Sequence, residues 1–310
     1  MFASLEIDGF RGFGALRLEG LGRVNLIMGK NNSGKTSLLE AITLLGNHQM
    51  IQALPGLFRA NTGLVADRFF PWLVKDGRAS ASLSARVGDS PRRIALAASP
   101  AQVEGLTRMT PRLGDVRLWV DSAPSLRVHA VSVQHRSPEV MVDSFAEAVR
   151  APLDEQQLVA LLASVDPRIT SVRLDSVESK PFIVVDIGLS KRVPLSQAGQ
   201  GIYRLVAVFS ELLGSRPDLC FIDELENGIH YTSLAAVWRG IAEVAARLDI
   251  QVFATTHSWE CLLAAHEAFS ARDAYDFRVI QLYRMGEETE GRVLGRPHIE
   301  AAIAGQIELR

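Results

Sequence analysis

The stretch Gly29-Lys30-Asn31-Asn32-Ser33-Gly34-Lys35-Thr36 decides the fold, because it matches the phosphate-loop pattern G-x-x-x-x-G-K-[ST] at every fixed position. A mostly apolar run at 23–28 precedes it, and apolar residues at helical spacing follow from 36 to 45. Glycine at both ends lets the backbone curl so that successive N–H groups point at phosphate oxygens. The chain has only five lysines, and two of them lie here. The sequence therefore predicts a site for a nucleoside triphosphate.

The residue types within the loop suit the chemistry of a bound triphosphate. Lys35 would place a positive charge at the β- and γ-phosphates, and the Thr36 hydroxyl would be a ligand of Mg²⁺. The predicted helix directs its positive end at the same anion. An accidental glycine-rich turn is the alternative, but the strand before and the helix after argue against it. We expect the nucleotide to be bound by Gly29, Lys30, Asn31, Asn32, Ser33, Gly34, Lys35, Thr36 and Ser37.

Two acidic residues end a buried-strand pattern at 218–224. An acid at the carboxyl end of a central strand faces the crevice in which open α/β sheets bind ligands. Asp223 is then placed to hold Mg²⁺, and Glu224 to act as general base on the attacking water. An ordinary acidic turn is the alternative for this pair, but the phosphate loop earlier in the chain favours the catalytic interpretation.

Two further segments belong to the same predicted sheet. The strand at 250–255 leads to His257, which can hydrogen-bond the γ-phosphate or the attacking water; a structural histidine is the alternative. Ser196 and nearby glycines precede a predicted helix at 202–213, which makes a second anion-binding N-terminus. One chain has no obvious use for two such sites on one γ-phosphate, whereas two chains packed head to tail do. A plain serine N-cap is the alternative for Ser196.

The patterns along the chain predict a single α/β nucleotide-binding domain of the P-loop NTPase class. Its expected parts are an amino-terminal lobe at 1–77, an antiparallel β meander at 78–136, a mainly helical insertion at 137–200 and a carboxyl-terminal lobe at 201–310. The meander prediction rests on short alternating runs, the last of them at 126–133. After residue 196 the expected elements are helices at 202–213, 231–247 and 259–268, and strands at 218–222, 250–255 and 278–285.

Composition excludes several classes of protein. Hydrophobic residues make up 47% of the chain and charged residues 22%, which excludes disorder, and 33 basic against 35 acidic residues exclude a polycation. The two cysteines, Cys220 and Cys261, form no disulfide framework or metal-site spacing, which fits a reducing compartment. The start of the chain lacks the basic residues of a signal peptide, and no apolar run is long enough to span a membrane. We therefore expect a soluble cytoplasmic protein.

In their order along the chain, these motifs resemble an ABC-type ATPase head of the SMC/RecF/OLD group. FASLEIDGFRGF at 2–13 and VNLIMGKNNSGKTSLLEAI at 24–42 resemble that group's amino-terminal lobe. LSQAGQG at 195–201 is similar to its signature loop, CFIDELENGIH at 220–230 to its Walker B strand and D-loop, and FATTHS at 253–258 to its switch-histidine segment. Residues 158–174 also resemble OLD-like ATPases related to abortive phage infection.

The resemblance implies an ABC-type head with an antiparallel β subdomain and an inserted helical subdomain. It also implies ATP and Mg²⁺ as cofactors and an ATP-sandwich homodimer, with Asn227 in a D-loop that crosses the interface. Arg11 and Phe13 match a position near the base and ribose. Gln134, at the end of the predicted strand at 126–133, is the candidate for the Q-loop glutamine that senses Mg²⁺ and the γ-phosphate, with a surface glutamine as the alternative.

The chain departs from the group's pattern in three ways. Its signature segment is one residue longer than LSGGQ, which leaves Gly199 and Gly201 as candidates for the phosphate-facing amide. No heptad run separates Thr36 from Ser196, so we do not expect long SMC-like arms. The chain contains no D-x-D motif, so we do not expect the TOPRIM nuclease that OLD proteins append.

Three functions are compatible with these features. The first is an ATPase, converting ATP and water to ADP and phosphate, whose ATP-driven dimerisation regulates a separate nuclease or toxin in anti-phage defence. The second is a RecF-like DNA-repair ATPase that clamps DNA. Residues 78–136 carry nine arginines and four acids, and this surface could track phosphates or form a solvated or protein-binding face. The third is a scaffold that binds ATP without hydrolysing it, against which Glu224 and His257 count.

Overall fold

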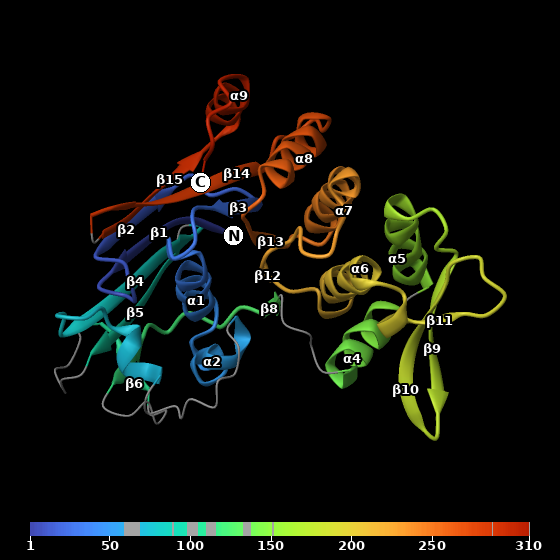
Figure 1. The fold of residues 1–310 in the computed structure, drawn as a ribbon. Coiled ribbons are helices and arrows are strands. Elements are labelled where there is room, and N and C mark those ends of the chain that lie inside the picture. Colours follow the sequence, from blue (N-terminus) through green and yellow to red (C-terminus); the bar gives the residue numbers. More distant parts are fainter. Residues whose placement is uncertain are drawn as a thin grey trace.

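A mainly parallel sheet carries the phosphate loop at one edge (Figure 1). The computed structural model describes residues 1–58, 69–88, 90–97, 105–109, 116–132, 138–150, 152–286 and 288–309. Across this sheet the strands are β15 (Glu288–Leu294), β14 (Phe277–Met285), β3 (Val24–Met28), β13 (Gln251–Thr256), β12 (Leu219–Ile222) and β8 (Val128–Val131). Neighbouring strands are parallel except β15, which runs antiparallel to β14. The loops that follow β3, β13 and β12 therefore meet at the same edge.

The central strands are buried on both faces because two hydrophobic cores share them. In β3, Leu26 and Met28 belong to one core and Ile27 to the other; in β13, Val252 and Phe253 divide in the same way. This double burial is why these strands are nearly continuous apolar runs. The first core contains side chains of α4 (Pro138–Ala148), α5 (Pro152–Val165), α6 (Gln200–Ser210), α7 (Leu234–Arg247), α8 (Trp259–Ser270) and α9 (Arg296–Ala304). The second contains those of α1 (Lys35–Gly46).

An antiparallel sheet covers the second core (Figure 1). Its strand order is β2 (Ala15–Glu19), β1 (Phe2–Asp8), β4 (Ser80–Val87), β5 (Ser90–Ala97), β7 (Arg117–Val120) and β6 (Thr107–Met109). The prediction that the run at 126–133 belongs to this meander is wrong, because β8 pairs in parallel with β12, with Val128 opposite Leu219. An alternating pattern shows that a strand is buried but not which distant strand it pairs with.

The remaining elements are a small sheet and several short helices. The small sheet has the order β11 (Val193–Pro194), β10 (Lys180–Asp186) and β9 (Ser171–Val177), and it lies beyond α4 and α5, at the right of Figure 1. The short helices are η1 (His48–Gln52), α2 (Leu54–Leu57), η2 (Phe70–Leu73), η3 (Leu195–Gln197) and η5 (Tyr231–Ser233). A π-helical turn, η4 (Glu211–Ser215), continues α6. In the part of the chain that the structure describes, no helix has both the length and the apolar character needed to cross a membrane.

Arg92 closes the carboxyl end of α1. Its side chain is buried, and Nη1 donates hydrogen bonds to the carbonyl oxygens of Leu45 at 3.2 Å and Gly46 at 3.3 Å. Nη2 donates to the carbonyl oxygen of Pro124 at 2.5 Å. A cation at a helix carboxyl terminus satisfies carbonyls that have no partner within the helix. Arg92 is therefore part of the α1 cap rather than of a surface that contacts phosphates.

We expect Arg92→Met to lower the free energy of unfolding by about 1–3 kcal/mol, because buried carbonyls lose a charged donor. Arg93→Met is the matched control, since Arg93 is the next residue on β5 and its side chain is exposed. Urea unfolding of the two variants measures the difference. Equal stability of the two variants would show that the cap contributes nothing.

Candidate active site

Glycines shape the phosphate loop where a side chain would not fit. A Cβ on Gly29 would lie 2.4 Å from the Oγ of Ser33 and 2.5 Å from the carbonyl oxygen of Leu282. Gly34 has a φ of 90°, and a Cβ there would meet the Phe13 ring at 2.9 Å. The curled path between β3 and α1 therefore requires glycine at both positions.

The amino terminus of α1 has the character of an anion site. Its N-cap residue, Gly34, has no side chain to cap the first turn, and that turn holds no acidic residue. The buried Oγ of Ser33 has no hydrogen-bond partner within the described ranges. Uncapped N–H groups beside an unsatisfied buried hydroxyl fit the phosphates of a nucleotide.

Lys35 folds back over the loop. Its Nζ donates hydrogen bonds to the carbonyl oxygens of Gly29 at 2.8 Å and Lys30 at 3.0 Å, and it lies 3.4 Å from Nδ1 of His257. Burial lowers the pKa of Lys35, and the carboxylates near the end of β12 oppose this shift. The ammonium group is thus held by weak neutral acceptors, which phosphate oxygens can replace.

The acidic turn after β12 is held by Thr255 on the neighbouring strand. Thr255 Oγ1 donates to Asp223 Oδ1 at 2.7 Å and accepts from the backbone N–H of Glu224 at 2.8 Å. Burial raises the pKa of Asp223, and the hydrogen bond from Thr255 opposes this rise. Glu224 has a φ of 46°, in the left-handed region that residues other than glycine seldom adopt. Unusual backbone of this kind clusters at functional sites.

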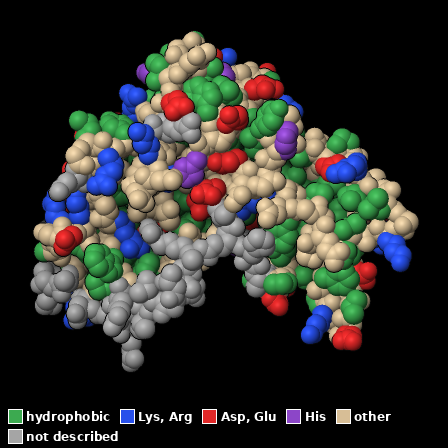
Figure 2. All heavy atoms as spheres, viewed as in Figure 1, with side chains coloured by type: hydrophobic (Ala, Val, Ile, Leu, Met, Phe, Trp, Pro, Cys, Tyr) green, Lys and Arg blue, Asp and Glu red, His purple; other side chains and the backbone are tan. Residues whose placement is uncertain are grey.

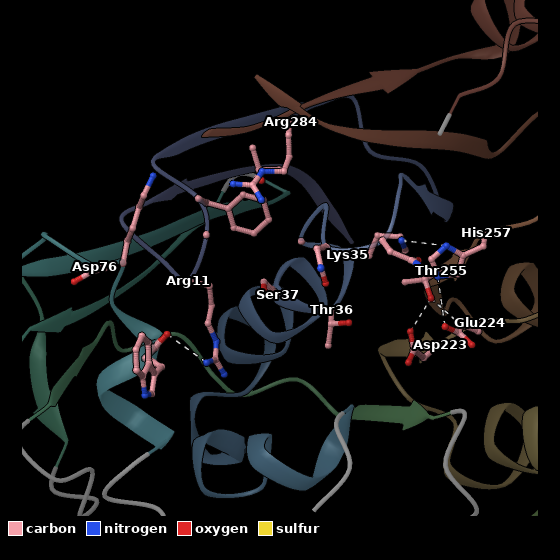
Figure 3. A pocket seen from close by; sticks show the side chains of 18 of the residues that line it. Arg11, Lys35, Thr36, Ser37, Asp76, Asp223, Glu224, Thr255, His257 and Arg284 are labelled. Atoms are coloured by element: carbon pink, nitrogen blue, oxygen red, sulfur yellow. Dashed lines mark hydrogen bonds and ion pairs between the residues drawn. The ribbon is translucent and has the colours of Figure 1, made fainter. Parts of the chain in front are cut away.

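His257 follows β13 and lies between the lysine and the second carboxylate (Figure 3). Its Nε2 is 3.5 Å from Oε1 of Glu224. Its backbone N–H donates to Oε1 of Glu226 at 2.8 Å, so the loop after β12 fixes the loop after β13. The structure therefore brings Lys35, Asp223, Glu224 and His257 together.

These residues surround a cavity of about 930 Å³, within the size range of small-ligand pockets. A second cavity, of about 460 Å³, is lined by Gly29, Lys30, Asn31, Glu224 and His257. The larger cavity is lined by Arg11, Gly12, Phe13, Asn31, Asn32, Gly34, Lys35, Thr36, Ser37, Trp72, Val74, Lys75, Asp76, Asp223, Glu224, Thr255, His257, Arg284 and Thr289. Glu224 and His257 thus border both cavities.

Thr36 and Asp223 could hold a metal ion in the larger cavity, where they come from α1 and the end of β12 (Figure 3). The described residues contain no group of three or more His, Cys, Asp or Glu that could hold a metal ion by itself. One hydroxyl and one carboxylate are the kind of sparse oxygen set that Mg²⁺ takes when phosphates and water complete its coordination. The donors therefore fit Mg²⁺ carried with a nucleotide.

Arg11 lines the larger cavity, but its guanidinium already contacts three groups. Nε and Nη2 donate to the two oxygens of the fully buried Glu40 carboxylate at 2.9 and 3.2 Å. The guanidinium lies 4.5 Å from the centre of the Phe69 ring, and Nη1 donates to the carbonyl oxygen of Trp72 at 3.3 Å. Arg11 thus ties the cavity wall at Trp72 to α1. No sequence pattern singles out Trp72, a residue that is 68% exposed.

The predicted signature loop lines neither cavity. Ser196 lies in η3, and Gly199, with a φ of 96°, is the residue before α6. Gly201 packs against the predicted D-loop, because a Cβ there would lie 2.7 Å from the carbonyl oxygen of Gly228. Gly199 has open space around its Cα.

Two other predicted site residues lie apart from the cavities or cannot be placed. Asn227 is exposed, and its backbone N–H donates to the carbonyl oxygen of Glu224 at 3.0 Å. Gln134 falls outside the described residues. A buried arginine that no motif pointed to, Arg204 on α6, contacts the backbone next to the site.

A phosphate loop after β3, a histidine after the adjacent strand β13 and acids after β12, the next strand along, form the arrangement of an ABC-type ATPase head. The fold agrees with this class, since the chain is similar over 98% of its length to an SMC head bound to the C-winged helix domain of ScpA, of which it covers 99%. The TM-score is 0.64 and the identity 13%. The predicted fold class is confirmed: the chain has an SMC head-like α/β ATPase fold.

The chain belongs to the family described as "AAA domain, putative AbiEii toxin, Type IV TA system", whose model matches residues 77–263. A second AAA-domain model matches residues 4–48, which include the phosphate loop. The sequence is 25% identical over 122 residues to an ATP/GTP phosphatase of Helicobacter pylori, covering 38% of this chain and 32% of that protein. It is 46% identical over 56 residues to the DNA replication and repair protein RecF of Idiomarina loihiensis, covering 18% and 15%. The chain spans a third or less of the length of the curated relatives that it matches.

Proposed function

We propose that this chain binds ATP with Mg²⁺ and hydrolyses it. One observation carries the proposal: the side chains that the reaction needs surround a single cavity, and they come from the ends of the adjacent strands β12 and β13 and from the start of α1, the helix that follows β3. The residues are Lys35, Thr36, Asp223, Glu224 and His257. The family and the similarity to an ATP/GTP phosphatase support the same reaction.

Each residue has a distinct part in this proposal. Bound Mg²⁺-ATP supplies the electrophilic γ-phosphorus and the charge of the metal. Lys35 exchanges its loop carbonyls for phosphate oxygens, and Thr36 and Asp223 hold the metal. Glu224 accepts a proton from the attacking water, and His257, 3.5 Å away, orients the carboxylate. A scaffold that never hydrolyses ATP would not need this pair.

We propose a homodimer as the active form. Glu224 and His257 border the smaller cavity beside Gly29 and Lys30, and one chain leaves this face of the loop open. Ser196 and its glycines line neither cavity of their own chain. In the dimer they cover the partner's phosphate loop, with either Gly199 or Gly201 providing the amide.

We propose that the ATPase regulates a separate effector, a nuclease or toxin, in anti-phage defence, and that it belongs with the OLD-like proteins. The description of its family, which names a putative toxin of a type IV toxin–antitoxin system, supports the link to such a system, and the separate effector is our proposal. The resemblance of residues 158–174 to OLD-like ATPases supports the subgroup.

A DNA-repair function is the second candidate, favoured by the 56-residue similarity to RecF. Lys and Arg side chains gather at the left of Figure 2, the side on which Figure 1 has the antiparallel sheet. The arginines of 78–136 are not all available to phosphates, however. Arg92 is buried in the α1 cap, and Arg127 pairs with Asp218 at 3.0 Å. The basic surface is therefore smaller than the arginine count indicates.

Phosphate release from ATP tests the proposal directly. The turnover per chain should rise with protein concentration, because only a dimer completes the site, and EDTA should abolish it because Asp223 and Thr36 then lack the metal. Turnover that does not depend on concentration would show that one chain is sufficient. Absence of phosphate release with ATP bound would favour the scaffold function.

A further inference from the structure

A buried arginine contacts the backbone of the catalytic turn. Arg204 lies on α6 and is 7% exposed. Its Nη1 donates to the carbonyl oxygen of Ser132, just after β8, at 2.6 Å. Its Nη2 donates to the carbonyl oxygens of Asp223 and, at 3.4 Å, Glu224. One guanidinium therefore joins the end of β8 to the first two residues of the turn that follows the neighbouring strand β12.

The turn needs such support because of its conformation. Glu224 has a left-handed φ of 46°, which its own side chain does not favour. Thr255 holds one side of the turn through the Glu224 N–H and the Asp223 carboxylate. Arg204 holds the other side through the two carbonyls. Without Arg204, the turn can relax and the Glu224 carboxylate moves with it.

Arg204 is also placed on a rigid support. The helix α6 packs into the first core, where Leu205, Val206 and Val208 are buried. Gly201, one turn before Arg204, packs against the carbonyl of Gly228. Helix α6 therefore contacts the segment 223–228 at two places: Arg204 bonds Asp223 and Glu224, and Gly201 packs against Gly228. These two contacts limit how far the turn can move.

We propose that Arg204 is a positioning residue for ATP hydrolysis: it acts through the backbone of Asp223 and Glu224 and sets the direction of the Glu224 carboxylate. This inference rests on the proposed role of Glu224 as general base. It assigns Arg204 no contact with nucleotide, since Arg204 lines neither cavity.

Three single variants separate positioning from simple structural support. Arg204→Met keeps the length of the side chain but removes the donors, and it should lower kcat about 100-fold, the effect of a misplacement near 1 Å. The affinity for ATP should not change, because the phosphate loop is intact. Arg204→Lys keeps one donor and should recover part of the loss. Arg239→Met, at an arginine on α7 with 54% side-chain exposure, is the control and should behave as the wild type.

A double-variant cycle gives the decisive measurement. If Arg204 acts through Glu224, then adding Arg204→Met to Glu224→Gln should cause no further loss in the single-turnover rate. If the loss of rate in the double variant equals the product of the losses in the two single variants, the inference is overturned. A wild-type kcat in Arg204→Met would also overturn it. A parallel loss of ATP affinity in both Arg204 variants would also overturn it in favour of a structural role. A wild-type protein that binds ATP without turnover would instead refute the proposed hydrolysis itself.

Discussion

Lys35→Ala should abolish the binding of ATP at micromolar concentrations. The substitution removes the lysine side chain that folds over the loop, where Nζ is within 3.0 Å of two loop carbonyls. Removing the cation that faces a buried anion costs about 2–5 kcal/mol, which is roughly 30-fold to several thousandfold in affinity. Calorimetric titration with ATP and Mg²⁺ measures the change.

Lys30→Ala is the matched control, because it removes the same charge from the same loop at an exposed side chain. It should weaken binding far less than Lys35→Ala. Circular dichroism should show that both variants keep the fold. Wild-type affinity in Lys35→Ala would mean that this loop is not the triphosphate site.

Glu224→Gln should trap an ATP-bound dimer. Glutamine is close to glutamate in shape but cannot accept a proton from water, so hydrolysis should fall by about two to four orders of magnitude. ATP binding is kept, because Lys35, Thr36 and Asp223 are unchanged. An ATP that bridges two chains and is not consumed holds them together. Light scattering with ATP and Mg²⁺ should then report twice the mass of one chain.

Ser196→Arg added to Glu224→Gln should reverse the trapping, because it blocks the second anion site and leaves the phosphate loop intact. Glu226→Gln is a control two residues along, where an amide oxygen can still accept from the N–H of His257. It should not trap the dimer. If the light-scattering mass with ATP is the same in all of these variants, the ATP-sandwich dimer is excluded. Ser196 would then be a plain helix cap.

The parts of the fold that the sequence predicts well are those set by neighbouring residues or by a general rule of sheet topology. The phosphate loop is one, because glycine spacing and the following helix are local features. The alignment of Asp223 and His257 at one edge is another, because parallel strands of one sheet end on the same side.

The parts that could not be predicted depend on contacts between distant residues. β8 pairs with β12, which lies about ninety residues later, and its alternating pattern suits either sheet. Arginine is a residue type usually found at the surface, and only the position of α1 in the fold makes Arg92 a helix cap. Arg204 lies in an apolar helix where no motif marks it, and its acceptors become visible only when β8, β12 and α6 are placed together.

The two cores that share β3, β13 and β12 have a consequence for how the molecule opens. Alternate residues of each strand belong to different cores, so neither half can melt while the other keeps its strands ordered. We therefore expect local fraying to be confined to the periphery, and the amide protons of these strands to exchange with solvent only when the whole domain unfolds. On this expectation, the phosphate loop, the acids and the histidine are attached to the slowest-exchanging part of the chain.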